Sequence, residues 1–204
     1  MSDSQEHIDR IKAFSKSYFI PLMLTIICLA IYFSDLNMLL RYQRSDISII
    51  RSWSLLSANF THLSLAHLAA NLAAVFIIWS LFWLETSRKI QLLNILILSV
   101  AVGIGVHFFS EEVKIYTGFS GTAHGLIISG ALITLTPKNT IFNGIVIVGT
   151  LLKHAHEHFS DDKTSPLFNN GYVVTDAHQY GIIAAFVFGI CFWLYKRAER
   201  KPLR

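Results

Sequence analysis

The ten residues Tyr116-Thr117-Gly118-Phe119-Ser120-Gly121-Thr122-Ala123-His124-Gly125 place a serine between small residues at the start of an apolar segment. Small neighbours let other backbone segments and a ligand approach the hydroxyl closely. In a helix, His124 lies one turn below Ser120 on the same face. Ser120 is therefore a candidate nucleophile in apolar surroundings.

The alternative interpretation of the same stretch is structural. Membrane helices often pack through stripes of small residues, and such a stripe is available here: Gly118, Gly121, Gly125 and Ser129. A Gly-x-Ser-Gly tetrapeptide is a weak signal alone. The rest of the chain has to decide between the two.

Composition indicates an integral membrane protein. Of the 204 residues, 53% are hydrophobic and only 15% are charged, and the mean hydropathy is +0.50. These values exclude an ordinary soluble domain. The net charge of +4 comes from short basic clusters beside apolar runs, which set membrane orientation and predict no nucleic-acid partner. Cys28 and Cys191 lie inside apolar runs, so no disulfide is expected.

Six apolar runs are each close to the ~20 residues that a helix needs to cross a membrane. They cover residues 18–35, 63–84, 91–110, 116–136, 141–159 and 172–195. Because the runs are continuous, we predict an all-α bundle of six transmembrane helices. The whole chain, 1–204, is predicted to form one membrane domain, with a short N-terminal segment 1–17 and a C-terminal tail 196–204.

Successive connections between the runs lie on opposite sides of the membrane. The segments on one side contain eleven Lys and Arg residues, and those on the other side contain five. Both termini are therefore predicted to be cytoplasmic. The first run, which follows basic residues but lacks a cleavage site, is predicted to be a retained span. The apolar connection 36–62 is expected to lie in the outer interface.

Polar side chains inside the runs are costly in lipid and mark candidate functional positions. His67 and Asn71 lie four residues apart on one face of the second run, and His62 is expected near its mouth. His178 precedes a small-residue stripe in the sixth run, Gly181, Ala185 and Gly189. The structural alternative for each polar residue is an interhelical hydrogen bond.

Topology brings these groups to one depth. The second, fourth and sixth runs cross in the same direction, which puts their polar groups about 5 to 12 Å below the outer surface. If the small-residue stripes of the fourth and sixth runs pack together, Ser120 and His178 come within reach. A neutral histidine can then take the serine proton, while Asn71, His67 and the Ser120 N–H can stabilise an oxyanion. We expect a polar cavity open to the outside.

Three motifs together resemble the rhomboid intramembrane serine proteases over residues 60–190. They are His62, His67 and Asn71 in the spacing H-x4-H-x3-N, then Gly118-Phe119-Ser120-Gly121, then Ala177-His178 followed by small residues. The resemblance implies Ser120 as nucleophile, His178 as general base, and His67 with Asn71 as oxyanion donors. The supporting positions are His62, Gly118, Gly121, His124 and Gly181. No cofactor or metal is implied.

Within that family the chain resembles the rhombosortases. The details are His124 in Ser-Gly-x-x-His-Gly, Lys153 with Glu157 in the fifth run, and a short C-terminal tail. This resemblance implies cleavage of membrane-anchored proteins that carry a C-terminal Gly-Gly motif, an apolar helix and a basic tail. It places the enzyme in a bacterial inner membrane, with its active site opening to the periplasm.

Some features leave alternatives open. Many rhomboids carry a Trp-Arg pair in the first outer loop, whereas Trp53 here follows Arg51 by two residues. His124 either tunes His178 or merely packs. His154 and His158 are spaced to share a metal ion, although a Lys153–Glu157 ion pair with histidines at the wet interface is the favoured interpretation.

The rival functions are a rhomboid with other single-span substrates, an inactive rhomboid-like binder, and a histidine-lined transporter or metal-handling protein.

Overall fold

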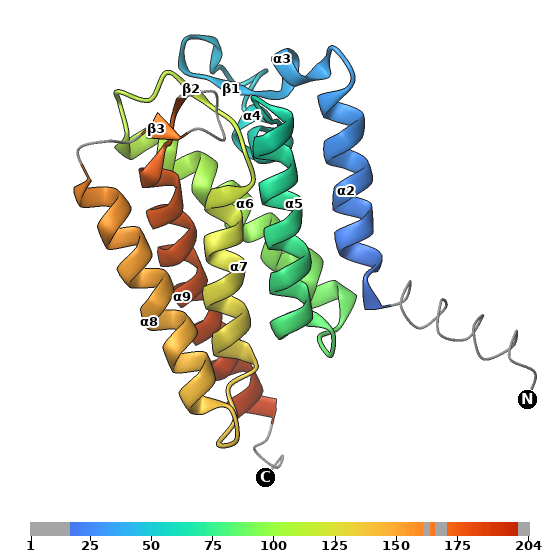
Figure 1. Ribbon diagram of the computed structural model, residues 1–204, viewed down its shortest axis with the longest axis vertical. Coiled ribbons are helices and arrows are strands. Elements are labelled where there is room, and N and C mark those ends of the chain that lie inside the picture. The colour runs from blue at the N-terminus through green and yellow to red at the C-terminus, as the bar shows by residue number, and fades with distance from the viewer. Residues whose placement is uncertain (1–16, 161–163, 166–170, 200–204) are drawn as a thin grey trace, which may run out of the picture.

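The structure is a computed structural model that describes residues 17–160, 164–165 and 171–199. Six longer helices of this part form a bundle (Figure 1). They are α2 (Phe19–Tyr32), α5 (Leu65–Ile78), α6 (Arg88–Phe109), α7 (Ser120–Ile133), α8 (Thr140–Phe159) and α9 (Thr175–Glu199). A π-helical turn, η3 (Trp79–Trp83), continues α5.

Short elements gather at one end of the bundle, at the top of Figure 1. They are α3 (Leu36–Leu40), β1 (Tyr42–Gln43), η1 (Arg44–Asp46), α4 (Ser54–Ser57), η2 (Ala58–Phe60), β2 (Ile115–Tyr116), β3 (Thr164–Ser165) and β4 (Gly171–Tyr172). Strand β1 pairs antiparallel with β2, and β3 pairs antiparallel with β4. The helix starts of α5, α7 and α9 lie at this same end.

Three stretches in the described residues are long and apolar enough to cross a membrane: Leu65–Trp83, Arg88–Phe109 and Thr175–Ala198. Two further apolar helices, α2 and α7, are shorter. Helix α8 has the length, but Lys153, Glu157 and three histidines lower its hydropathy. The helical fold class and the positions of the six predicted helices agree with the sequence analysis, apart from the ends.

The predicted start of the fourth run, at residue 116, is wrong. Residues 115–116 form β2, and α7 begins only at Ser120. Gly118 lies between them with a φ of +109°, a conformation that favours glycine, and its N–H donates to the Ala58 carbonyl at 3.0 Å. With 14 residues, α7 is only about 21 Å long. Ser120 therefore occupies a helix start instead of the interior of a continuous span.

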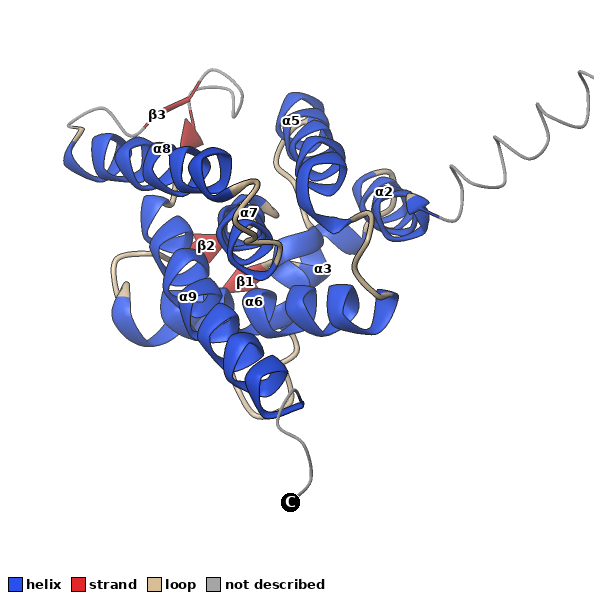
Figure 2. Ribbon diagram, turned by 90° about the horizontal axis from the view of Figure 1, so that it is seen from below, coloured by secondary structure: helices blue, strands red, loops and turns tan. Residues whose placement is uncertain are grey.

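Helix α7 lies in the middle of the bundle, with α5, α6, α8 and α9 around it (Figure 2). Its contact with α9 is made by glycines, as the sequence predicted. A Cβ on Gly181 would lie 2.0 Å from the Gly121 carbonyl oxygen, and one on Gly125 would lie 2.8 Å from the Gly181 carbonyl oxygen. Ser129 differs from the predicted stripe, because its hydroxyl accepts a hydrogen bond from Asn94 of α6 at 2.7 Å.

The connection 36–62 packs on α6, and Arg44 anchors it. Its guanidinium donates to four carbonyl oxygens at or beyond the C-terminal end of α6, at 2.8 to 3.1 Å: those of Val106, His107, Ser110 and Val113. These carbonyls include groups that the helix itself leaves unpaired. Arg51 instead pairs with Asp46 at 2.7 Å and lies over the Trp53 ring. Sequence reasoning missed the role of Arg44.

A buried polar network fixes the first turn of α7. The Thr122 hydroxyl donates to Asn59 Oδ1 at 2.8 Å, and Asn59 Nδ2 donates to the Ser99 carbonyl of α6 at 3.1 Å. All three residues are fully buried. Because buried polar groups are costly when unpaired, this network holds η2, α6 and α7 in one register.

Candidate active site

Ser120 and His178 meet at the glycine contact between α7 and α9. Ser120 Oγ lies 3.0 Å from His178 Nε2, although 58 residues separate them. Gly121 follows the serine directly, and Gly181 lies one turn beyond the histidine. The close approach of these two glycines therefore sets the distance between hydroxyl and imidazole. His178 is buried, whereas Ser120 is partly exposed.

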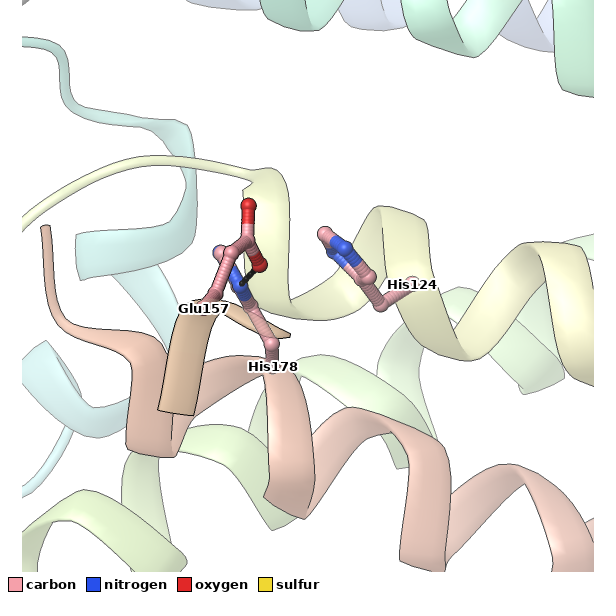
Figure 3. Close-up of side chains that lie close together, drawn as sticks. All are labelled: His124, Glu157 and His178. Carbon is pink, nitrogen blue, oxygen red and sulfur yellow. Dashed lines mark hydrogen bonds and ion pairs between the residues drawn. The ribbon is translucent and has the colours of Figure 1, made fainter. Parts of the chain in front are cut away.

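Glu157 of α8 approaches the other nitrogen of the same imidazole (Figure 3). Its Oε2 atom lies 3.1 Å from His178 Nδ1, and its Oε1 atom pairs with the Lys153 ammonium one turn earlier. The Lys153–Glu157 ion pair was predicted and is confirmed. The contact between Glu157 and His178 was not predicted, because the sequence does not reveal that the C-terminal part of α8 lies beside the start of α9.

His124 stacks on His178. The two ring centroids are 4.0 Å apart and the rings are nearly parallel, at 16°. His124 Nδ1 donates to the Ser120 carbonyl at 2.8 Å, so its Nε2 is left to accept from Lys153 Nζ at 3.2 Å. His124 thus contacts both Lys153 and His178, and it is held as a neutral ring.

Gly118 lies against His67 and Asn71 rather than in the packing stripe of α7. A Cβ on Gly118 would lie 2.6 Å from His67 Nε2 and 3.7 Å from Asn71 Nδ2. Asn71 Nδ2 is buried and has no hydrogen-bond partner among the described residues. A donor held in this way beside the turn that leads to Ser120 is suited to an incoming oxygen atom.

His62 lies just before the start of α5, where the sequence analysis expected it, but its side chain is buried, with only 1% exposed. Its ring packs edge-on against His67, with centroids 4.9 Å apart. Burial lowers the pKa of His62 to about 4. The ring is therefore neutral at pH 7, and it packs against the His67 ring.

Comparison with known families agrees with this geometry. The family model described as the Rhomboid domain matches residues 51–195, which is most of the chain. The chain belongs to the rhomboid family. Rhomboids are intramembrane serine proteases that act on membrane proteins within the lipid bilayer. No curated protein matches the chain.

In this rhomboid, a cavity of about 610 Å³ reaches Ser120. His67 also lines it, together with three charged residues, Arg41, Glu112 and Lys114. The remaining lining is largely apolar and includes residues of β2 and the segment before α9. The cavity was predicted to be polar, but its lining combines charged and apolar side chains. Such a lining suits a peptide with apolar side chains and also admits the water that hydrolysis requires.

Metal binding by this rhomboid would have to use different residues from those predicted. His124, Glu157 and His178 offer ligand atoms within 4.8 Å of one another, and these form the candidate cluster among the described residues. However, the Lys153 ammonium already contacts both His124 and Glu157. His154 and His158 lie outside that cluster, with ring centroids 5.9 Å apart. A metal ion at the cluster of His124, Glu157 and His178 would have to displace the Lys153 ammonium.

Proposed function

We propose that this rhomboid hydrolyses peptide bonds with Ser120 as nucleophile and His178 as general base. The 3.0 Å contact between Ser120 Oγ and His178 Nε2 carries the proposal, because a serine needs an adjacent base to become nucleophilic. Ser120 also lines a cavity of about 610 Å³. Both features belong to an active enzyme rather than to a binder that has lost its catalytic residues.

In the first step, the Ser120 oxygen bonds to the scissile carbonyl carbon while its proton moves to His178 Nε2. The carbonyl π electrons move onto the oxygen and form an oxyanion. His178 then gives its proton to the leaving amine as the C–N bond breaks. Water hydrolyses the resulting acyl-enzyme through the same two groups in reverse, which restores the serine.

The oxyanion is stabilised by His67, Asn71 and the Ser120 N–H in this proposal. The Ser120 N–H belongs to the first turn of α7, where backbone donors are not used by the helix. Asn71 supplies a buried amide beside Gly118, and His67 lines the cavity. Gly118 leaves the room that the oxygen atom requires, since a side chain there would overlap the His67 ring.

The proposed substrates are membrane-anchored proteins with a C-terminal Gly-Gly motif, an apolar helix and a basic tail. Ser-Gly-x-x-His-Gly around Ser120 supports this rhombosortase-like assignment, and so does Lys153, which contacts both His124 and Glu157. We further propose six spans in one domain, with both termini cytoplasmic and the site open to the periplasmic side of an inner membrane. The two glycines of the substrate motif carry no side chains, so an unwound substrate backbone can approach Ser120 closely.

The experiment compares two anchored substrates that differ only in the Gly-Gly motif. Purified protein in lipid is incubated with each substrate, using wild type, Ser120→Ala and His178→Ala, with and without a chelator. We expect cleavage by wild type that is unaffected by chelator and absent in both variants, with the Gly-Gly substrate preferred. Equal cleavage of the two substrates would support a rhomboid with broader single-span substrates. Cleavage that survives Ser120→Ala would contradict the serine mechanism.

A further inference from the structure

We propose that Glu157 is a positioning residue for His178, so that the reaction uses a serine–histidine–glutamate triad whose third member comes from α8. This inference rests on the proposed function. The three groups form one chain of contacts, from Ser120 Oγ to His178 Nε2 at 3.0 Å and from His178 Nδ1 to Glu157 Oε2 at 3.1 Å. The residues come from three different helices, which meet only through the fold.

The carboxylate fixes the tautomer that the reaction requires. A carboxylate only accepts hydrogen bonds, so His178 Nδ1 must carry the proton that it donates to Glu157. The lone pair is then on Nε2, which faces the Ser120 hydroxyl. Without an acceptor at Nδ1, the neutral ring would divide between two tautomers, and only one of them can take the serine proton.

Glu157 also stabilises the imidazolium that forms when His178 takes that proton. Its carboxylate stays ionised throughout, and the proton shuttles only between Ser120, His178 and the leaving group. Two features moderate the effect: Lys153 shares the carboxylate, and the Glu157 side chain is 28% exposed, against 4% for His178. Charge interactions weaken where solvent is near. The expected effect is therefore smaller than the ~10⁴-fold seen when a fully buried triad carboxylate is replaced.

The contact between Glu157 and His178 forms only when α8 is packed against the rest of the bundle. Only Asn143 and Thr150 are buried among the residues of α8, and Gly144 and Gly149 have open space beside them. Asn143 holds the N-terminal part of α8 by donating to the Ala131 carbonyl at 2.8 Å. Near its C-terminal end, Lys153 and Glu157 join α8 to His124 and His178. Full competence of the base thus requires α8 to be docked.

The test separates positioning from a merely structural ion pair. Glu157→Gln removes the charge, and Glu157→Asp keeps it on a shorter side chain. The double variant Lys153→Glu with Glu157→Lys keeps an ion pair one helical turn apart but puts an ammonium beside His178. Glu111→Gln, a change at an exposed glutamate outside the site, is the matched control. Each protein is assayed in lipid for kcat, KM and thermal unfolding.

We expect Glu157→Gln to lower kcat about 10²- to 10³-fold with KM within about threefold. Glu157→Asp should recover part of that loss, and the charge-swapped double variant should be as impaired as Glu157→Gln while unfolding at nearly the wild-type temperature. Glu111→Gln should match wild type.

A folded charge-swapped variant with wild-type kcat would overturn the triad, because the ion pair alone would then suffice. That result leaves the proposed function intact as long as Ser120→Ala and His178→Ala are inactive. Cleavage by Ser120→Ala would instead overturn the proposed function itself. If Glu157→Gln fails to fold, the charge-swapped variant still decides the question.

Discussion

Replacing Gly181 by alanine should separate the two halves of the site. The added Cβ would lie 2.0 Å from the Gly121 carbonyl oxygen, whereas ordinary contact begins at about 3.4 Å. The Cβ is fixed to the α9 backbone and the oxygen belongs to the α7 backbone, so no flexible side chain can move aside. Helices α7 and α9 must then move apart by about 1.4 Å at this point.

That movement acts directly on the reacting atoms. Ser120 adjoins Gly121, and His178 lies one turn before Gly181, so their 3.0 Å contact would lengthen beyond hydrogen-bond distance. A displacement of about 1 Å in a catalytic pair lowers the rate about 10²-fold. Forcing an extra carbon into a packed interface destabilises a protein by about 1 to 3 kcal/mol.

The assay measures kcat and thermal unfolding of Gly181→Ala in lipid beside Gly149→Ala. Gly149 is also helical but has nothing within 4 Å of its Cβ position, so alanine there should leave kcat unchanged and stabilise α8 slightly. We expect Gly181→Ala alone to lose about 10²-fold in kcat. Wild-type kcat and unfolding temperature for Gly181→Ala would refute the close glycine contact on which the site depends.

Three further substitutions test an oxyanion donor, the ring stacked on His178 and the anchor of the connection 36–62. Asn71→Ala should lower kcat about 10²- to 10³-fold with little change in KM, because one oxyanion donor is lost; an unchanged kcat would remove Asn71 from the site. His124→Ala should lower kcat about tenfold, since a stacked ring pair contributes about 0.5 to 1.5 kcal/mol, while His124→Tyr keeps a ring and should stay within about threefold; equal loss in both would argue against stacking. Arg44→Lys should lower the unfolding temperature nearly as much as Arg44→Met, because an ammonium cannot reach four carbonyls in the geometry of a guanidinium; full rescue by lysine would contradict that anchor.

Periodic and compositional features of the sequence predicted the helices and the meeting of Ser120 with His178. Apolar runs located the helices because length and hydropathy are local properties. The glycine contact was predictable because Gly121, Gly125 and Gly181 have no side chain that could keep two helices apart. Because Ser120 and His178 were predicted at the same depth in the membrane, they were expected to meet. In the structure, Ser120 Oγ lies 3.0 Å from His178 Nε2.

What the sequence could not predict depends on contacts between distant segments. Glu157 had a satisfactory local partner in Lys153, so nothing in the sequence required a second one in α9. The late start of α7 depends on Gly118 and its hydrogen bond to Ala58, which lies 60 residues earlier. Arg44 resembled an ordinary loop cation, and only the fold brings it to the end of α6.

Covalent labelling by a fluorophosphonate, located by peptide mass spectrometry, shows whether Ser120 is an activated nucleophile. The reagent phosphonylates a serine whose hydroxyl a neighbouring base activates. We predict a single adduct on Ser120 in wild type, with labelling strongly slowed in His178→Ala and unaffected by chelator. Labelling at another residue, or equal labelling of Ser120 when His178 is replaced, would contradict the proposed roles of Ser120 and His178.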